Sequence, residues 1–329
     1  MTRNRERIDV GVIGVGSMGH HHARVYSELP EATLVGVADT DADRATAVAS
    51  EYGTAAMDRE SLLDAVDAVS VVVPTQYHYE VATACLDADV ATFVEKPVLG
   101  SLERADEFRS RIEAADVPFQ VGHIERFNPA VVELETILEE CAIASVRARR
   151  LGPPVDREVG NSVVRDLMIH DIDIVLSLLR DDPVSVAAAG VDGNGHAAAL
   201  LEFDGGTMAS LTASRKTQRK VRTLEITAEE CFIELDYLGQ SIEIHRNSVP
   251  EYIETDGDVR FKHERLIERP AVPGGEPLRM ELESFLETVA TEKPPAVPVD
   301  EALAALSVAM AIERETERAT MPDGLEFDR

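Results

Sequence analysis

Apolar runs of strand length alternate with helical patterns along the first 122 residues. The runs occupy residues 8–13, 33–38, 68–73, 90–94 and 118–121, and the helical patterns occupy 18–29, 42–52, 59–65, 78–87 and 101–115. The run at 68–73, AVSVVV, is nearly continuous, as expected of a strand buried on both faces of a parallel sheet. Strands that alternate with helices predict right-handed crossovers and a parallel α/β domain.

The pattern changes beyond residue 122. Helical patterns at 129–140 and 163–179 flank an alternating strand at 143–150, and strands with turn signals fill 184–245. Asp204-Gly205-Gly206 joins two of these strands as a hairpin, so the sequence predicts an α+β domain with a mainly antiparallel open sheet. Two helices, 278–290 and 300–317, finish the chain. We expect domains at 1–122 and 123–295, with 296–329 returning to the first, and homo-oligomers (dimer or tetramer) formed through the open sheet.

The first strand leads into a glycine turn, Gly14-Val15-Gly16-Ser17-Met18-Gly19, and a helix follows at once. In such a turn the first glycine permits the tight bend, the second admits a pyrophosphate and the third lets helix and strand pack. The pyrophosphate lies at the helix N-terminus, where NH groups such as those of Ser17 and Met18 are unpaired. The pattern predicts an N-terminal Rossmann dinucleotide-binding domain. The alternative is a purely structural turn.

The second strand ends in Asp39, twenty residues beyond Gly19. An acid there accepts hydrogen bonds from the adenine ribose and repels a 2′-phosphate. Thr40 follows Asp39, and we expect no arginine close behind it that would bind a 2′-phosphate. The sequence therefore favours NAD over NADP as the cofactor. The alternative interpretation of Asp39 is a surface acid.

Other strand ends carry polar residues, and in a parallel sheet ligands gather at this edge. They are Pro74-Thr75, Glu95-Lys96-Pro97 and Gly122-His123. Lys96 is the only lysine in the first half of a chain with five lysines, which favours a functional role over that of a surface lysine.

The predicted helix 163–179 carries Asp166, His170 and Asp173 among apolar residues. Residues four apart share one helix face, about 6 Å apart along the axis. Oxidation of a secondary alcohol needs a base for the hydroxyl proton and a positive charge beside the oxygen. His170 can act as the base, Asp166 can orient it or relay the proton, and Lys96 can supply the positive charge. A core histidine with solvent-facing acids is the alternative.

Composition and charge exclude several classes of function and partner. The formal charge of −29 and pI of about 4.6 disfavour nucleic acid and anionic membranes, and suggest life at high salt, although an ordinary acidic protein is the alternative. Three cysteines without a CxxC pair, no secretory signal and no membrane-spanning run predict a reduced, cytoplasmic protein. His20-His21-His22 point in different directions on a helix, so we expect no metal site.

Four segments together resemble the glucose-fructose oxidoreductase / inositol dehydrogenase / MocA (Gfo/Idh/MocA) family over nearly the full length. They are GVGSMGHHHA at 14–23, PTQYH at 74–78, EKP at 95–97 and the DxxxHxxD set at 166–173. The resemblance implies an NAD-dependent sugar dehydrogenase with Lys96, Asp166 and His170 as its catalytic set. It also implies that Thr75 and His78 lie near the nicotinamide, with Pro74 alongside, and that Glu95 and Lys96 contact the cofactor.

A narrower resemblance concerns GHIERFNPAV at 122–131 and RDLMIHDIDIVLSL at 165–178. These look like the branch of UDP-N-acetylglucosamine 3-dehydrogenases, which oxidise the sugar C3 hydroxyl. The resemblance implies that Arg126 and Asn128 contact the sugar, with Lys96, His170 and Asp173. An anionic UDP-sugar needs arginines, and the candidates are Arg126, Arg149, Arg150, Arg157 and Arg165. Alternative functions are a free polyol or sugar dehydrogenase of inositol type and a non-catalytic nucleotide-sensing regulator.

Overall fold

The computed structural model describes residues 7–139, 141–154, 162–191, 195–247, 251–255, 258–262, 264–291 and 293–318. Contacts divide the chain into two compact units, 1–127 with 275–307, and 128–274 with 308–329. The division groups the helix at 277–291 with the first unit, whereas the sequence analysis placed it in the second domain. None of the described helices combines the length and hydropathy needed to cross a membrane.

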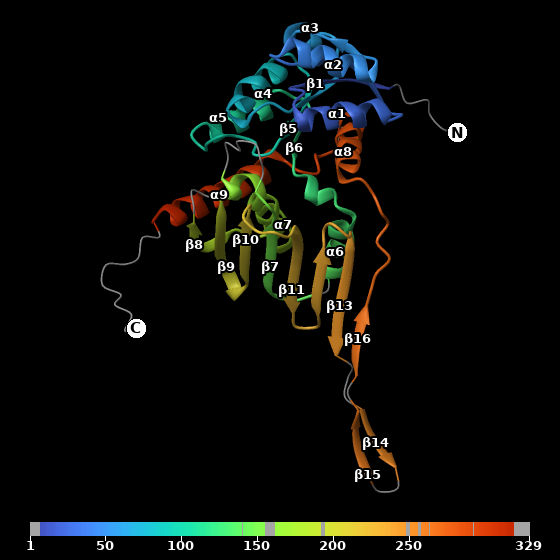
Figure 1. Cartoon of the computed structure of the whole chain (residues 1–329), viewed down its shortest axis with the longest axis vertical. Coiled ribbons are helices and arrows are strands. Elements are labelled where there is room, and N and C mark those ends of the chain that lie inside the picture. Colours follow the sequence, from blue (N-terminus) through green and yellow to red (C-terminus); the bar gives the residue numbers. More distant parts are fainter. Residues whose placement is uncertain are drawn as a thin grey trace. The chain divides into compact units, whose positions relative to one another are not determined.

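The first unit contains a six-stranded parallel sheet in the order β3-β2-β1-β4-β5-β6 (Figure 1). Its strands are β1 Ile8–Ile13, β2 Ala32–Ala38, β3 Ala55–Ala56, β4 Ala68–Val71, β5 Ala91–Glu95 and β6 Phe119–Gly122. Its helices are α1 Ser17–Glu28, α2 Ala42–Tyr52, α3 Arg59–Leu63, α4 His78–Asp87, α5 Ala105–Ala114 and α8 Pro277–Thr291, with short 3-10 turns at Thr75–Tyr77 and Ile124–Phe127. The predicted parallel α/β architecture is confirmed.

Two-sided burial explains the apolar strands of this sheet. Every residue of β4 and β5 is buried, because a parallel sheet is covered on both faces. Helix α8 adds Phe285, whose ring lies 5.6 Å from the ring of Phe93 in β5. The core of the first unit therefore includes a helix that lies far from the sheet in the sequence.

The boundaries of α2 follow from its capping residues. The Asp41 carboxylate accepts a hydrogen bond from the Arg44 backbone N–H at 3.1 Å, which satisfies one of the first unpaired amides of the helix. Gly53 ends the helix in the left-handed conformation at φ 66°. Both ends were predicted from the sequence.

The second unit contains an eight-stranded sheet in the order β16-β13-β12-β11-β7-β10-β9-β8, in which only the β7–β10 pair is parallel. Its strands are β7 Ile143–Leu151, β8 Pro183–Val191, β9 His196–Phe203, β10 Met208–Ser214, β11 Val221–Ala228, β12 Phe232–Asp236, β13 Ser241–Asn247 and β16 Arg265–Glu268. A separate hairpin pairs β14 Glu251–Thr255 with β15 Asp258–Lys262. The mainly antiparallel sheet is confirmed.

One face of this sheet is covered by helices. Helices α6 Pro129–Leu138 and α7 Ile169–Leu179 contact β12, β13, β7 and β10, and alternate residues of β9 are buried. The predicted hairpin between β9 and β10 turns at Gly205 and Gly206, whose φ angles are 81° and 91°. Apolar residues such as Leu200 and Met208 remain exposed on the opposite face. The last helix, α9 Val299–Arg318, begins in the first unit and ends in the second.

The helix predicted at 163–179 is not a regular α-helix. Residues Val164–Met168 form a π-helical turn, and α7 begins only at Ile169. Asp166 lies in the π turn and His170 lies in α7, and the shared face of their side chains stays a prediction. Such single π turns are frequent at functional sites.

A buried ion pair attaches α7 to β7. The Arg150 guanidinium donates two hydrogen bonds to the Asp171 carboxylate, at 2.9 and 2.8 Å, and both side chains are buried. The Arg150 guanidinium also lies 5.1 Å from the centre of the Tyr237 ring. Two charges buried together are costly to separate, because the remaining charge has no solvation. The pair therefore fixes the helix segment between His170 and Asp173.

We expect Asp171→Asn to lower the free energy of unfolding by about 3–5 kcal/mol, because it leaves the Arg150 charge buried without a counterion. Denaturant unfolding monitored by circular dichroism measures this loss. Asp87→Asn is the matched control, since it breaks the exposed Asp87–Arg111 pair and should change the stability little. Equal stability of the two variants would contradict the structural role of the buried pair.

Candidate functional site

The glycine turn after β1 has the shape of a phosphate cradle. A Cβ on Gly14 would lie 2.6 Å from the Val72 carbonyl oxygen, and one on Gly19 would lie 1.8 Å from the Gly14 carbonyl oxygen. A Cβ on Gly16 would meet nothing within 4 Å, so the space beside it is open. Helix α1 begins at Ser17 without a side-chain cap, which leaves its first N–H groups available to an anion. These residues fit a dinucleotide pyrophosphate.

Asp39 closes this turn from the end of β2. One carboxylate oxygen accepts a hydrogen bond from the Val15 N–H at 2.8 Å, and the other accepts one from the Asp41 N–H at 2.9 Å. The side chain is only 6% exposed. The carboxylate is thus positioned by the backbone at the edge where a ribose would lie.

Arg44 corrects the expectation that no arginine lies close behind Asp39. Its Nη1 lies 3.3 Å from both Asp39 oxygens, and its Nη2 lies 3.0 Å from Asp41 Oδ2. The sequence interpretation missed it because the first turn of α2 returns residue 44 to the end of β2. The only available signal was its place one turn after the Asp41 cap.

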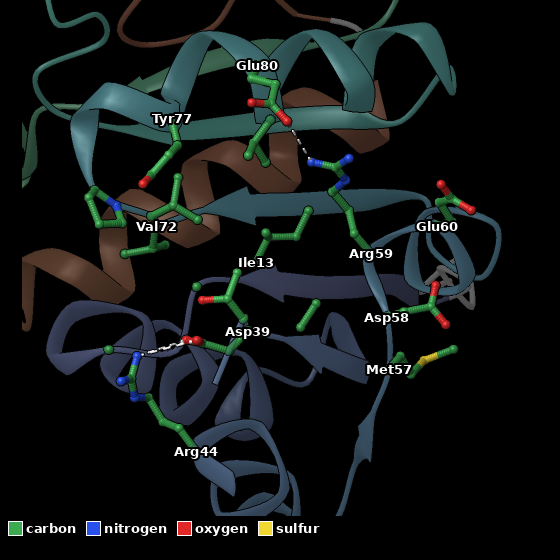
Figure 2. A pocket seen from close by; sticks show the side chains of 17 residues that line it. Ile13, Asp39, Arg44, Met57, Asp58, Arg59, Glu60, Val72, Tyr77 and Glu80 are labelled. Carbon is green, nitrogen blue, oxygen red and sulfur yellow. Dashed lines mark hydrogen bonds and ion pairs between the residues drawn. The ribbon is translucent and has the colours of Figure 1, made fainter. Parts of the chain in front are cut away.

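A cavity of about 1000 Å³ opens beside the glycine turn, at the carboxyl ends of β1, β2 and β4 (Figure 2). The predicted residues Gly14, Gly16, Asp39 and Pro74 line it. The sequence interpretation missed several other lining residues, namely Arg44, Met57, Asp58, Arg59, Tyr77 and Glu80. An ion pair of 3.6 Å joins Arg59 to Glu80 across this cavity.

Lys96 follows a buried carboxylate at the end of β5. Glu95 Oε1 lies 3.1 Å from Nε2 of the fully buried His22, and Glu95 Oε2 accepts a hydrogen bond from the Lys96 backbone N–H at 3.1 Å. Burial opposes ionisation of Glu95, but the hydrogen bond and charge of His22, together with the Lys96 charge, lower its pKa. A buried anion therefore fixes the backbone at Lys96.

His78 is 1% exposed and connects the loops that follow β4 and β5. Its ring nitrogens lie 2.8 Å from the carbonyl oxygens of Pro97 and Val73. Burial lowers the pKa of the His78 imidazole, and the two carbonyl groups oppose this shift. Both nitrogens are thus engaged by the backbone. Thr75 begins the short 3-10 turn that precedes His78.

The second unit contains the other predicted catalytic residues. Asp166 lies in the π turn and forms an ion pair of 2.5 Å with Arg215, which follows β10. His170 is the second residue of α7, and Asp173 is buried one turn later. Arg215 was missed by the sequence interpretation, because it is 49 residues away and only the β-sheet brings it to Asp166.

Most of the residues predicted to bind the sugar or the diphosphate form hydrogen bonds or ion pairs with other residues of the chain. Asn128 caps α6 by accepting from the Ala130 N–H, and its amide donates to the Tyr237 carbonyl at 3.1 Å. Four candidate arginines pair with carboxylates: Arg126 with Glu301, Arg149 with Glu225, Arg150 with Asp171 and Arg165 with Glu313. Arg157 lies outside the described residues.

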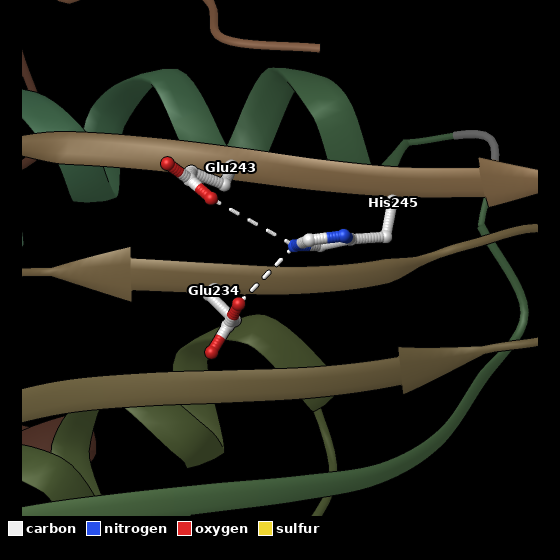
Figure 3. Close-up of side chains that lie close together, drawn as sticks. All are labelled: Glu234, Glu243 and His245. Carbon is white, nitrogen blue, oxygen red and sulfur yellow. Dashed lines mark hydrogen bonds and ion pairs between the residues drawn. The ribbon is translucent and has the colours of Figure 1, made fainter. Parts of the chain in front are cut away.

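The three consecutive histidines do not gather around one point. His20 contacts Glu51 at 3.1 Å, and His22 contacts Glu95. Across the described part of the chain, potential metal ligands gather in one group of three, Glu234, Glu243 and His245, on neighbouring strands β12 and β13 (Figure 3). His245 Nε2 lies 3.1 Å from Glu234 and 3.9 Å from Glu243, as in an ion pair. We assign no metal to this group.

Two family models match the chain. Residues 8–123 match a model described as an oxidoreductase family with an NAD-binding Rossmann fold. Residues 142–234 match the model of the GFO/IDH/MocA C-terminal domain.

The chain is 34% identical over 292 residues to a UDP-N-acetylglucosamine 3-dehydrogenase of Acidithiobacillus ferrooxidans, covering 86% of this chain and 89% of that protein. A solved structure of that name and organism superposes with a TM-score of 0.87 at 30% identity, over 95% of this chain and 98% of that one. An inositol 2-dehydrogenase of Rhizobium meliloti is 30% identical over 187 residues, covering 54% and 57% of the two chains. The chain belongs to the Gfo/Idh/MocA family of NAD-binding oxidoreductases, whose relatives here are dehydrogenases of sugars and polyols.

Proposed function

We propose that this enzyme oxidises the C3 hydroxyl of UDP-N-acetylglucosamine to a ketone, with NAD as the hydride acceptor. The observation that carries the proposal is the 34% identity to a UDP-N-acetylglucosamine 3-dehydrogenase along 86% of the chain. The residues Lys96, Asp166 and His170, which the chemistry of alcohol oxidation requires, are all present. Their joint presence also argues against a non-catalytic regulator.

Each residue of this set has a separate role. His170 accepts the proton of the substrate hydroxyl, since imidazole exchanges protons near neutral pH. Lys96 supplies a fixed positive charge that stabilises the oxygen as it loses the proton. Asp166 orients His170 or relays the proton, and it forms an ion pair with Arg215.

The first unit supports the role of Lys96. Because Glu95 holds the Lys96 backbone N–H and is itself held by His22, the main chain at Lys96 has a fixed position. His78 fixes the neighbouring Pro97 carbonyl. We propose that Glu95, His22 and His78 are positioning residues, and that Thr75 lies near the nicotinamide, as the family resemblance implies.

A second candidate function is the oxidation of a free polyol of inositol type. The identity of 30% to inositol 2-dehydrogenases favours it, although these matches cover only about half of the chain. Asn128 weakens the specific sugar assignment, because its amide is engaged by Ala130 and Tyr237. Arg126, held by Glu301, remains our candidate for the sugar.

NADH formation with a panel of substrates tests the proposed function. With NAD at high salt, we expect turnover of UDP-N-acetylglucosamine and little turnover of myo-inositol or simple hexoses. The 3-keto product should be detected by mass spectrometry as the loss of two hydrogen atoms. Turnover of the free sugars alone would establish the second candidate and refute the first.

Two side chains at the rim of the cavity support NAD over NADP. Asp39 places a negative charge where the ribose hydroxyls would bind, which repels a 2′-phosphate. Arg44 offers a positive charge at the same place, but Asp39 and Asp41 both engage it. The local charge is therefore negative, and Arg44 becomes available to a phosphate only when Asp39 is neutral.

We expect Asp39→Asn to raise the ratio of kcat/KM for NADP to that for NAD by at least about tenfold. Asparagine still accepts from Val15. Arg44 Nη2 stays with Asp41, but Nη1 loses its charged partner, and a hydrogen bond from Nη1 to a phosphate is worth about 1.5–3 kcal/mol. The gain should disappear in the Asp39→Asn/Arg44→Gln double variant. An unchanged ratio in the single variant would show that Asp39 does not select the cofactor.

A further inference from the structure

The densest positive charge of the chain lies in the loop between β10 and β11. Five of the eight residues at 215–222 are basic and none is acidic, whereas the whole chain has 61 acidic and 32 basic residues. The basic residues are Arg215, Lys216, Arg219, Lys220 and Arg222. We call residues 215–222 the basic loop. Such a local excess in an acidic protein requires an explanation.

Hydrogen bonds give the basic loop a defined shape. The Thr217 N–H donates to the Gly152 carbonyl at 3.0 Å, and the Thr217 hydroxyl lies within hydrogen-bond distance of the Gly152 and Arg219 carbonyls. The Lys216 N–H donates to the Ser214 hydroxyl at 3.1 Å. The backbone of the loop is therefore folded against the end of β7.

Two cations of the basic loop have no ion-pair partner in the described part of the chain. Among the residues that the structure describes, no carboxylate forms an ion pair with Arg219 or Lys220, and both side chains are exposed. This differs from the four described arginines that the sequence suggested for a diphosphate, which are all paired with carboxylates. In a chain with about two acids for every base, exposed neighbouring cations without a partner among the described residues can bind an external anion.

The basic loop begins beside a predicted catalytic residue. Arg215 pairs with Asp166, and β10 and β7 run parallel, so their carboxyl ends reach the same edge of the sheet. Four residues span at most about 14 Å of extended chain, which limits how far Arg219 can lie from Arg215. An anionic group joined to the reacting sugar by a short linkage is therefore within reach of the loop.

We propose that the basic loop binds the diphosphate of the nucleotide-sugar substrate, with Arg219 and Lys220 as its main contacts. This inference rests on the proposed function, since a free polyol has no such group. Guanidinium and ammonium groups both bind phosphate oxygens by charge-assisted hydrogen bonds. An extended polyanion is a poor partner, because the surrounding protein carries a net charge of −29.

Calorimetric titration of UDP into the full chain, with and without Arg219→Gln/Lys220→Gln, tests the proposal. We expect the double variant to bind UDP at least about tenfold more weakly and to raise KM for UDP-N-acetylglucosamine by a similar factor, with kcat little changed. Pyrophosphate should compete with UDP, and uridine should not. The control, Arg246→Gln/Arg269→Gln, removes the same charge from arginines that pair with Glu268 and Glu243, and should behave like the unmodified protein.

The outcomes separate this proposal from the proposed function. If UDP-N-acetylglucosamine is oxidised but the loop variant keeps its UDP affinity and KM, the diphosphate binds elsewhere and only the basic loop is refuted. Equal losses in the loop variant and the control would show a general charge effect, and would also refute the loop. If the unmodified protein neither binds UDP nor oxidises the UDP-sugar, both the substrate and the loop assignment are wrong.

Discussion

A single carboxylate, that of Asp39, determines the form of the cofactor cradle. It accepts the N–H groups of Val15 and Asp41 and engages Arg44, so the glycine turn, the end of β2 and the start of α2 are joined by one side chain. These bonds are all made between residues of the chain. Open space at Gly16 and a cavity lie beside this arrangement.

Charge compensation organises the second unit in a similar way. The buried Arg150–Asp171 pair attaches α7 to the sheet, and the ion pair of Asp166 with Arg215 connects the π turn to β10. Most arginines in this acidic chain serve such internal pairs, and an arginine found in the sequence is therefore poor evidence for an anion site. What distinguishes the basic loop is the lack of described partners for Arg219 and Lys220. Which charges pair with each other depends on the fold and cannot be read from composition.

The sequence predicted the features that depend on residues close together in the chain. Apolar runs predicted the strands, the helical pattern at 42–52 predicted α2, and Asp204-Gly205-Gly206 predicted the hairpin. Contacts between distant residues were missed, among them His22 with Glu95, Arg215 with Asp166, and the Glu234, Glu243 and His245 group set by strand register. The π turn was missed because no residue pattern marks it. The domain boundaries, the homo-oligomer and the catalytic roles stay predictions.

The most direct test of the account is to separate catalysis from cofactor binding at Lys96. In Lys96→Ala, NADH formation from UDP-N-acetylglucosamine should fall by at least about a hundredfold, because a fixed charge beside the reacting oxygen contributes on that order. The affinity for NAD, measured by calorimetry on the same protein, should stay within a few-fold, since the cradle is built by Gly14, Gly16 and Asp39. Unchanged turnover would contradict the assigned chemistry, whereas loss of NAD binding would make Lys96 a cofactor ligand without a proven catalytic role.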